Sequence, residues 1–380
     1  MVMTILCFSG GIIFLLPFLR EVYYLPMQEA FGYDNTQMGV QMSVFGFVSL
    51  ISYFPGGWLA DRFSPRKLIA SSLVATGLGG FYFATFPSYE TGIAIHAFWG
   101  ASISLAFWAA MIKATRNWAP PEEQGRAFGI LESGRGIAEV LSSTLFLAVF
   151  AWLGSNASAL AQVINLFGAT NILLAMLAWL ILDDEIGKPE DVGEKVGLQQ
   201  VLAVLKMPAV WLIAIVVMTA YSAYWGSYYF APYATDIFGL SVVLGGAVAV
   251  GKMWLKPFAA AGAGFVADRF GVSRTVFVAF LVVTSGFLLF GVLPGGEAWL
   301  LVMLVNAAIV SAAIFALRGI YFALLEEGGV DAAVTGTAAG VISAVGFTPD
   351  VFMPLLGGVL LDAYPGEDGY RYFYLAIAGL

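Results

Sequence analysis

Gly57-Trp-Leu-Ala-Asp61-Arg62-Phe-Ser-Pro-Arg66-Lys67 is a short charged stretch between two long apolar segments. A similar stretch, Gly264-Phe-Val-Ala-Asp268-Arg269-Phe, ends another apolar segment 207 positions later. A second pair of stretches, beginning at Gly125 and Gly336, repeats the spacing Gly-x-x-x-Gly at an offset of 211. Two similar offsets at separate places predict that the chain is built from two related halves.

The composition around these stretches is typical of a membrane protein. Apolar residues make up 60% of the 380 residues, charged residues make up 11%, and the mean hydropathy is +0.87. Soluble domains are about 45–50% apolar and about 25% charged. The apolar blocks are roughly 20 residues long, which suits helices that cross a ~30 Å hydrocarbon layer. Strands of outer-membrane barrels instead alternate polar and apolar residues over about 10 positions. We therefore predict an all-α membrane protein.

Twelve apolar segments divide into two groups of six. They lie at about 3–25, 37–59, 66–86, 92–115, 127–153, 159–182, 208–232, 241–266, 274–293, 298–325, 333–361 and 370–380. The last segment would rise only about 16 Å as a helix, so we expect the chain to end inside a twelfth helix. We predict an N-terminal six-helix bundle at 1–182, a cytoplasmic connector at 183–206 and a C-terminal six-helix bundle at 207–380. The repeat predicts a pseudo-two-fold axis between the bundles.

The basic residues predict the orientation in the membrane. If the N-terminus is cytoplasmic, the outer loops hold only Arg371 among the lysines and arginines. Eleven others fall in cytoplasmic loops and helix ends: Arg62, Arg66, Lys67, Lys113, Arg116, Arg126, Lys188, Lys195, Lys206, Arg269 and Arg274. Basic residues stay on the cytoplasmic side of membranes. We therefore predict a multi-pass protein of a bacterial inner (plasma) membrane with a cytoplasmic N-terminus.

The scarcity of reactive residues argues against an enzyme. The chain has one cysteine, Cys7, and one histidine, His96. Neither a cysteine metal site nor a serine–histidine triad fits this composition. The sequence has no stripe of basic residues of the kind that indicates nucleic-acid binding. We predict no catalytic residues, no metal and no cofactor, and we expect a monomer whose partners are membrane lipid and a small solute.

The stretch Gly57–Lys67 resembles the signature loop of the major facilitator superfamily, Gly-x-Leu-Ala-Asp-Arg-x-Gly-Arg-Lys. It departs at Ser64-Pro65, where the pattern prefers Gly-Arg. The resemblance covers essentially the whole chain. It implies two six-helix bundles that rock about a central cavity, with this loop latching the cytoplasmic side. The gating residues implied in this way are Gly57, Asp61, Arg62, Arg66, Asp268 and Arg269. As an alternative, Arg62, Arg66 and Lys67 serve only as anchors that fix the topology.

A narrower resemblance is to the organophosphate:phosphate antiporters. It rests on Leu19-Arg20-Glu21, on the loop that ends at Arg66, and on Trp118-Ala-Pro-Pro-Glu-Glu-Gln-Gly125. It implies that Arg20 holds the substrate anion, and it places Arg135 where a relative carries a substrate-binding histidine. The second anion-binding arginine of that family falls at Tyr224 here. This departure weakens the case for phosphate esters and leaves the broader prediction of an organic anion.

Charged residues inside the predicted helices are candidates for function, because each costs about 2.5–3.5 kcal/mol to insert. Glu132, Arg135 and Glu139 are spaced i, i+3 and i+7 and share one helix face. An entering anion could displace a carboxylate from Arg135 and so couple loading to gate movement. The alternative is an internal salt-bridge stack. Arg318 is a candidate for gating or for a structural ion pair.

Two lysines and one aspartate complete the set of intramembrane charges that we single out. Lys252 and Lys256 are spaced i, i+4 and repel each other, so they call for a counter-charge such as Asp350, Glu139 or a substrate. Asp350 follows Pro349, whose missing N–H can open the backbone. It is our first candidate for a proton-accepting group.

Aromatic residues at helical spacing are candidates for lining the cavity. They are Tyr221, Tyr224, Trp225 and Tyr228 in the seventh segment and Trp108 in the fourth. The alternative is that these rings only pack in the protein or at the membrane interface.

The leading hypothesis is a secondary active transporter of a small phosphorylated, carboxylated or sulfonated anion. It would work as an antiporter or symporter with a counter-anion or a proton. The alternatives are a nitrate or nitrite porter, a proton-coupled carrier of a neutral solute, and a membrane sensor with a transporter fold.

Overall fold

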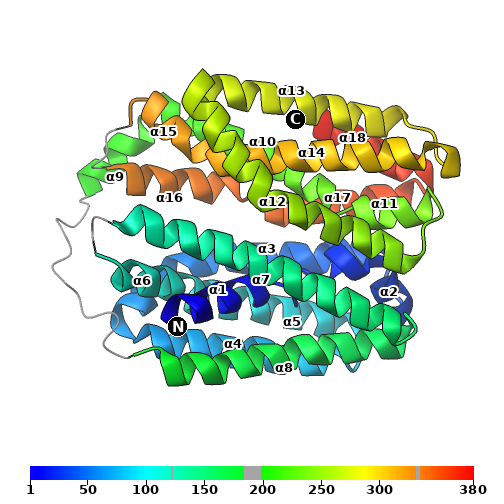
Figure 1. The fold of residues 1–380 in the computed structure, drawn as a ribbon, viewed down its shortest axis with the longest axis horizontal. Coiled ribbons are helices and arrows are strands. Elements are labelled where there is room, and N and C mark those ends of the chain that lie inside the picture. The colour runs from blue at the N-terminus through cyan, green and yellow to red at the C-terminus, as the bar shows by residue number, and fades with distance from the viewer. Residues whose placement is uncertain (121–122, 184–197, 331–333) are drawn as a thin grey trace. The chain divides into compact units, whose positions relative to one another are not determined.

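The computed structural model describes residues 1–120, 123–183, 198–330 and 334–380. Every regular element in these ranges is a helix, which confirms the predicted all-α class (Figure 1). The chain divides into two compact units, one with Met1–Pro189 and Ser241–Val250, the other with Glu190–Leu240 and Gly251–Leu380. The predicted connector falls largely on residues 184–197, outside the described ranges.

Unit 1 contains the helices of the first half of the chain. They are α1 (Val2–Ile12), α2 (Arg20–Phe31), α3 (Asn35–Arg62), α4 (Pro65–Phe83), α5 (Tyr89–Ala101), the π-helix η1 (Ser102–Trp108), α6 (Ala109–Trp118), α7 (Gln124–Trp152) and α8 (Ala157–Ile181). Local capping fixes several starts. Asp34 and Gln37 form a capping box at α3, and Ser64 caps α4 with Pro65 at its first position.

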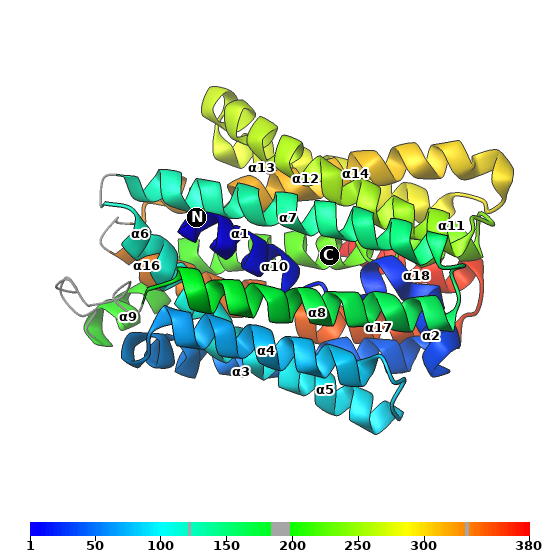
Figure 2. The ribbon, with the colours of Figure 1, turned by 60° about the horizontal axis from the view of Figure 1, so that its bottom comes forward.

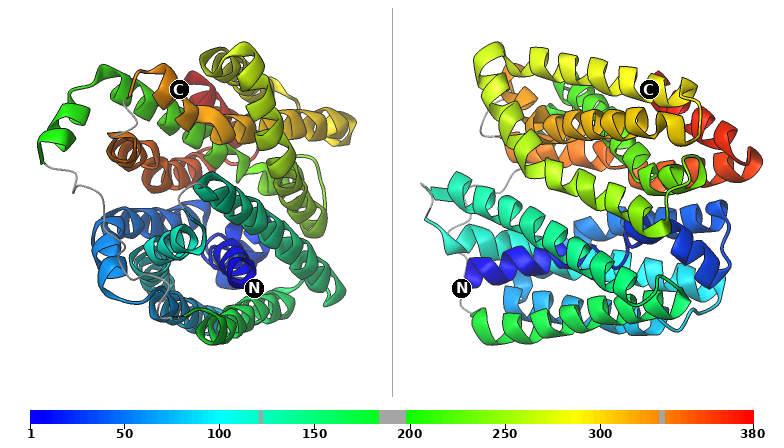
Figure 3. Two further views of the ribbon diagram at one scale, coloured as in Figure 1. Left: turned by 60° about the vertical axis from the view of Figure 1, so that its left-hand side comes forward. Right: turned by 45° about the vertical axis from the view of Figure 1, so that its right-hand side comes forward.

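Unit 2 contains the helices of the second half. They are α9 (Leu198–Leu205), α10 (Pro208–Ser227), α11 (Phe230–Asp236), α13 (Val272–Val292), η3 (Glu297–Trp299), α14 (Leu300–Ile320), η4 (Tyr321–Ala323), α15 (Leu324–Glu327), α16 (Thr335–Gly346), α17 (Pro349–Ala363) and α18 (Glu367–Gly379). Helix α12 (Val242–Phe270) contributes its first residues to unit 1 and the rest to unit 2. Helix α13 packs beside α14 and α18, drawn in yellow, orange and red in Figure 3.

Eight helical stretches among the described residues are long and apolar enough to cross a membrane. They are Tyr89–Trp118, Arg126–Trp152, Ala157–Ile181, Pro208–Asp236, Val242–Phe270, Val272–Val292, Glu297–Glu327 and Ala338–Ala363. Several predicted segments are interrupted in ways that apolar periodicity does not reveal. The fourth contains η1, and the eleventh breaks at Phe347 and Thr348, where Pro349 begins a new helix.

Glycines let the helices of unit 1 approach closely. Helix α4 packs along α8 (Figure 2), and a Cβ on Gly77 would lie 2.7 Å from the carbonyl oxygen of Gly168. Helix α1 packs on α7 in the same way. There a Cβ on Gly10 would lie 2.9 Å from the Arg135 side chain. Lipid is as apolar as the helix surface, so the hydrophobic effect does not drive helices together in a membrane. Close packing at small residues contributes to their association instead.

We predict that Gly77→Ala lowers the thermal midpoint of the protein purified in detergent. The new methyl group meets a backbone oxygen that cannot move without shifting α8, and such overpacking costs about 1–3 kcal/mol. Gly262→Ala in α12 is the matched control, because a Cβ there has no neighbour within 4 Å. Equal midpoints for Gly77→Ala and Gly262→Ala would contradict tight packing of α4 on α8.

Candidate functional site

Three aromatic side chains lie on one face of α10 in unit 2, and a fourth, at the residue that caps its end, continues the row. Tyr221, Tyr224, Trp225 and Tyr228 have the spacing i, i+3, i+4 and i+7, and we call them the α10 aromatic cluster. Trp225 stacks on Tyr228 with ring centroids 4.6 Å apart, and the Tyr228 hydroxyl donates to the Tyr224 hydroxyl at 3.1 Å. Tyr224, Trp225 and Tyr228 are buried. The cluster forms a continuous aromatic surface.

Two cations from other helices lie against this cluster. The guanidinium carbon of Arg318 on α14 is 3.9 Å from the centroid of the Tyr224 ring. The Nζ of Lys252 on α12 is 5.8 Å from the same centroid and 4.6 Å from that of Tyr228. Cations favour the negative face of aromatic rings. The structure therefore brings two positive charges to Tyr224, the position where the family resemblance placed an arginine.

Lys252 is also held by the end of α10. Its Nζ donates to the carbonyl oxygen and to the hydroxyl of Ser227, both at 2.9 Å. Ser227 is the last residue of α10, and helix C-termini carry partial negative charge. Part of the counter-charge predicted for Lys252 is therefore a helix end. Lys256 lies one turn further along α12 and is half-buried.

Asp350 contacts the same aromatic cluster from α17. Its carboxylate accepts a hydrogen bond from Trp225 Nε1 at 2.8 Å and one from the Tyr221 hydroxyl at 3.4 Å. Tyr221 also lies 5.5 Å from the guanidinium carbon of Arg318. Within unit 2 the structure thus brings together the predicted residues Lys252, Arg318 and Asp350, joined through the cluster.

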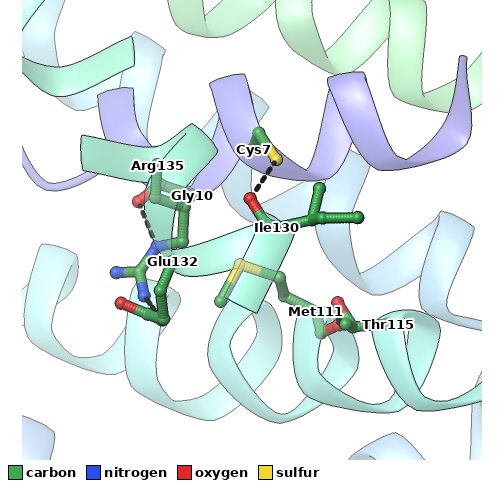
Figure 4. Close-up of polar contacts among 7 residues, drawn as sticks. All are labelled: Cys7, Gly10, Met111, Thr115, Ile130, Glu132 and Arg135. Atoms are coloured by element: carbon green, nitrogen blue, oxygen red, sulfur yellow. Dashed lines mark hydrogen bonds and ion pairs between the residues drawn. The ribbon is translucent and has the colours of Figure 1, made fainter. Parts of the chain in front are cut away.

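Arg135 of unit 1 bridges α1 and α7. Its Nε donates to the Gly10 carbonyl oxygen at 3.2 Å, and its Nη1 forms an ion pair with Glu132 (Figure 4). The guanidinium carbon lies 5.0 Å from the Trp108 ring. The side chain of Glu132 is 60% exposed, whereas that of Arg135 is 16% exposed. Of the predicted series on this helix, the pair Glu132–Arg135 is formed, and Glu139 is half-buried one turn along.

Arg20 begins α2 and is almost fully buried. Its Nη1 donates to the Met38 carbonyl oxygen at 2.9 Å, and its guanidinium carbon lies 4.9 Å from the Tyr24 ring. A backbone carbonyl and a ring face therefore seat Arg20 between α2 and α3. Trp108 ends the π-helix η1. A π-helical turn shifts the following side chains around the axis, and such turns are frequent at functional sites.

The signature stretch lies at the end of α3. Gly57 and Arg62 are exposed, and the guanidinium carbon of Arg62 lies 3.9 Å from the Trp58 ring. That of Arg66 lies 4.6 Å from the Trp179 ring of α8. The side chain of Asp61 is outside the described part of the structure.

The repeated stretch ends α12, and a contact that the sequence did not reveal lies just beyond it, at the start of α13. Asp268 and Arg269 are exposed. Glu327, at the end of α15, accepts hydrogen bonds from the backbone N–H groups of Val272 at 2.7 Å and Ser273 at 2.9 Å. It thereby caps α13, where an acid is favourable. Glu327 lies 55 residues from Val272, so no local spacing could have revealed this cap.

Comparisons with known proteins bear on the family and the fold of this chain. The family model described as Major Facilitator Superfamily matches residues 1–346. The chain is 31% identical over 375 residues to the inner membrane protein YihN of Escherichia coli (strain K12), covering 97% of this chain and 89% of that protein. It is 28% identical over 167 residues to the probable galactarate/D-glucarate transporter GudP of Bacillus subtilis (strain 168), covering 40% of this chain and 34% of that protein.

A solved structure shares the fold over the full chain. It is a bacterial homolog of the human lysosomal transporter Spinster, in an inward-facing and unoccupied conformation. The TM-score is 0.81 at 15% sequence identity, and the match covers 100% of this chain and 93% of that one.

We predict that Trp225→Phe lowers the thermal midpoint of the detergent-purified protein. Phenylalanine keeps the stacking but removes the Nε1–H donor to Asp350, and a buried acceptor that loses its partner costs about 1–3 kcal/mol. Trp152→Phe is the matched control, since Trp152 is 83% exposed. A midpoint for Trp225→Phe as high as that of the control would show that this hydrogen bond contributes little.

Proposed function

This chain belongs to the major facilitator superfamily and is a multi-pass membrane transporter, not an enzyme, and we propose that it carries a small organic anion by alternating access. The observation that carries the proposal is the charge at the α10 aromatic cluster. Lys252 and Arg318 both lie against Tyr224, and Asp350 is the carboxylate hydrogen-bonded to the cluster. These three groups sum to one positive charge, which favours an anionic solute.

A positive charge is costly in a membrane, so its presence there indicates a role such as substrate binding. Each intramembrane cation costs about 2.5–3.5 kcal/mol on insertion scales, and such residues mark substrate pathways. The relative GudP is named for galactarate and D-glucarate, which are organic anions. Both considerations support an anion over a neutral solute, since a carrier of neutral sugars needs no excess of cations.

Arg135 gives unit 1 an anion-binding group, because its guanidinium can exchange the Glu132 carboxylate for a substrate anion. Its ion-pair partner Glu132 is largely exposed, so a substrate anion can replace that carboxylate without burying a new charge. In the empty state Arg135 contacts Glu132, and in the loaded state it contacts the substrate anion. A difference in contacts between the two states is what couples binding to a conformational change. We assign Arg20 and Trp108 to the same binding surface, and Glu139 and Lys256 to charge balance.

The remaining assignments concern gating and placement in the membrane. The exposed residues Gly57, Arg62, Asp268 and Arg269, with Arg66 and Asp61, form the gating stretches of the two halves. Basic residues stay inside, so the N-terminus is cytoplasmic. YihN, a relative whose match covers nearly the whole chain, is named an inner membrane protein. We assign this chain to the same kind of membrane, and we propose that it is a monomer.

Proteoliposomes that contain the purified protein should accumulate radiolabelled D-glucarate in a saturable manner. Lys252→Gln should weaken apparent affinity by about tenfold or more, the equivalent of ~1.4 kcal/mol, because it removes a charge from the cluster. The matched control, Lys206→Gln, alters an exposed lysine at the end of α9 and should transport as the unmodified protein does. Uptake of a neutral sugar in place of every organic anion tested would refute the proposal.

Asp350 is the group that we assign to proton coupling. Asp350→Asn should abolish accumulation driven by a proton gradient, acidic outside, while exchange of labelled for unlabelled substrate continues. The amide can still accept from Trp225 but cannot take up a proton. Among the described residues, Tyr221 and Trp225 on α10 donate hydrogen bonds to Asp350, and Arg318 of α14 lies against Tyr221.

The control for proton coupling is Asp236→Asn, which alters a carboxylate that accepts from Tyr370 at 2.6 Å. It should keep gradient-driven accumulation. Accumulation by Asp350→Asn at the wild-type level would assign coupling elsewhere.

A further inference from the structure

Arg318 differs from Arg20, Arg135 and Lys252 in how its donors are used. Arg20, Arg135 and Lys252 each donate to a backbone carbonyl oxygen. The described contacts of Arg318 are with the faces of the Tyr224 and Tyr221 rings. Its Nη1 is buried and has no hydrogen-bond partner in the described part of the structure.

A buried guanidinium with an unpaired N–H donor needs a hydrogen-bond acceptor. Arginine stays charged in proteins and presents five N–H donors in a rigid fork. A ring face attracts the charge but accepts no in-plane hydrogen bond from this fork. Leaving a buried donor unsatisfied is costly, and the cost is larger for a charged group. Such an arrangement is retained where a ligand completes it.

The neighbouring carboxylate is committed to other donors. Asp350 accepts from Trp225 Nε1 at 2.8 Å and from the Tyr221 hydroxyl at 3.4 Å. Asp350 therefore places a negative charge near Arg318, on the other side of Tyr221, but accepts no described hydrogen bond from the guanidinium. Lys252 is likewise engaged with Ser227. Among the described residues of this cluster, Arg318 Nη1 is the buried side-chain donor that has no hydrogen-bond partner.

We propose that Arg318 binds a carboxylate group of the transported anion through paired hydrogen bonds, while the Tyr224 ring holds the guanidinium in place. The proposal rests on the proposed function and names its substrate class. A carboxylate is planar and matches the fork of arginine. The single charge of one carboxylate group neutralises the net charge of Lys252, Arg318 and Asp350, whereas one phosphate monoester group, at about −1.5 to −2, would overcompensate it. The hydroxyl and ring groups around Arg318 suit a hydroxylated carboxylic acid.

Thermal midpoints and dissociation constants of the detergent-purified protein would test this, with D-gluconate, D-glucose 6-phosphate and D-glucose as probes. Unmodified protein should bind D-gluconate more tightly than either other probe. Arg318→Lys keeps the charge but loses the fork, and it should weaken D-gluconate binding by about tenfold or more. Arg318→Gln should weaken it at least as much. Arg371→Lys, which alters an exposed arginine paired with Asp368, should bind as the unmodified protein does.

A second readout separates binding from folding. Arg318→Gln loses the two ring contacts but also removes a buried charge whose Nη1 has no hydrogen-bond partner in the described structure, so its ligand-free midpoint should equal or exceed that of the unmodified protein. A clear fall in that midpoint would assign Arg318 a structural role and overturn the inference. D-gluconate binding unchanged in Arg318→Lys or Arg318→Gln would also overturn it.

The probes distinguish this inference from the proposed function. Tighter binding of D-glucose 6-phosphate than of D-gluconate would overturn the carboxylate assignment and leave anion transport standing. Binding of D-glucose with no binding of either anion would overturn the proposed function itself, and the inference with it.

Discussion

A charge inside hydrocarbon needs an acceptor or a ring face close by, and this requirement shapes both units. Lys252, Arg20 and Arg135 each reach a backbone carbonyl, while Arg318 rests on Tyr224. Carbonyls become available where helices end or pass very near one another. Helix ends, glycine contacts and aromatic rows are therefore parts of one solution, which keeps cations in the membrane at tolerable cost.

Close helix packing and charge placement meet at α1. The absence of a side chain at Gly10 lets its carbonyl oxygen lie 3.2 Å from Arg135 Nε, and a Cβ there would press on the same arginine. One small residue thus brings α1 against α7 and seats the cation. The aromatic cluster plays the corresponding part in unit 2, since the ring of Tyr224 contacts cations from two helices.

The fold follows from the sequence further than the site does. Apolar blocks of spanning length indicate helices, and the repeat of Gly57-Trp-Leu-Ala-Asp61-Arg62 indicates two halves. The charged candidates also stand out, because charges are rare in such a sequence. What periodicity cannot supply is the partner of each charge. Trp225 and Asp350 lie 125 residues apart, and the cap from Glu327 spans 55, so these pairings depend on tertiary packing.

Tyr224 shows that a single position does not report the charge around it. A comparison made position by position would record a tyrosine where the resembling family carries an arginine, and would infer that positive charge is missing. In the structure, Arg318 and Lys252 bring positive charge to the Tyr224 ring from two other helices. The charge at such a place is therefore better compared between proteins over groups of spatial neighbours than over single aligned letters.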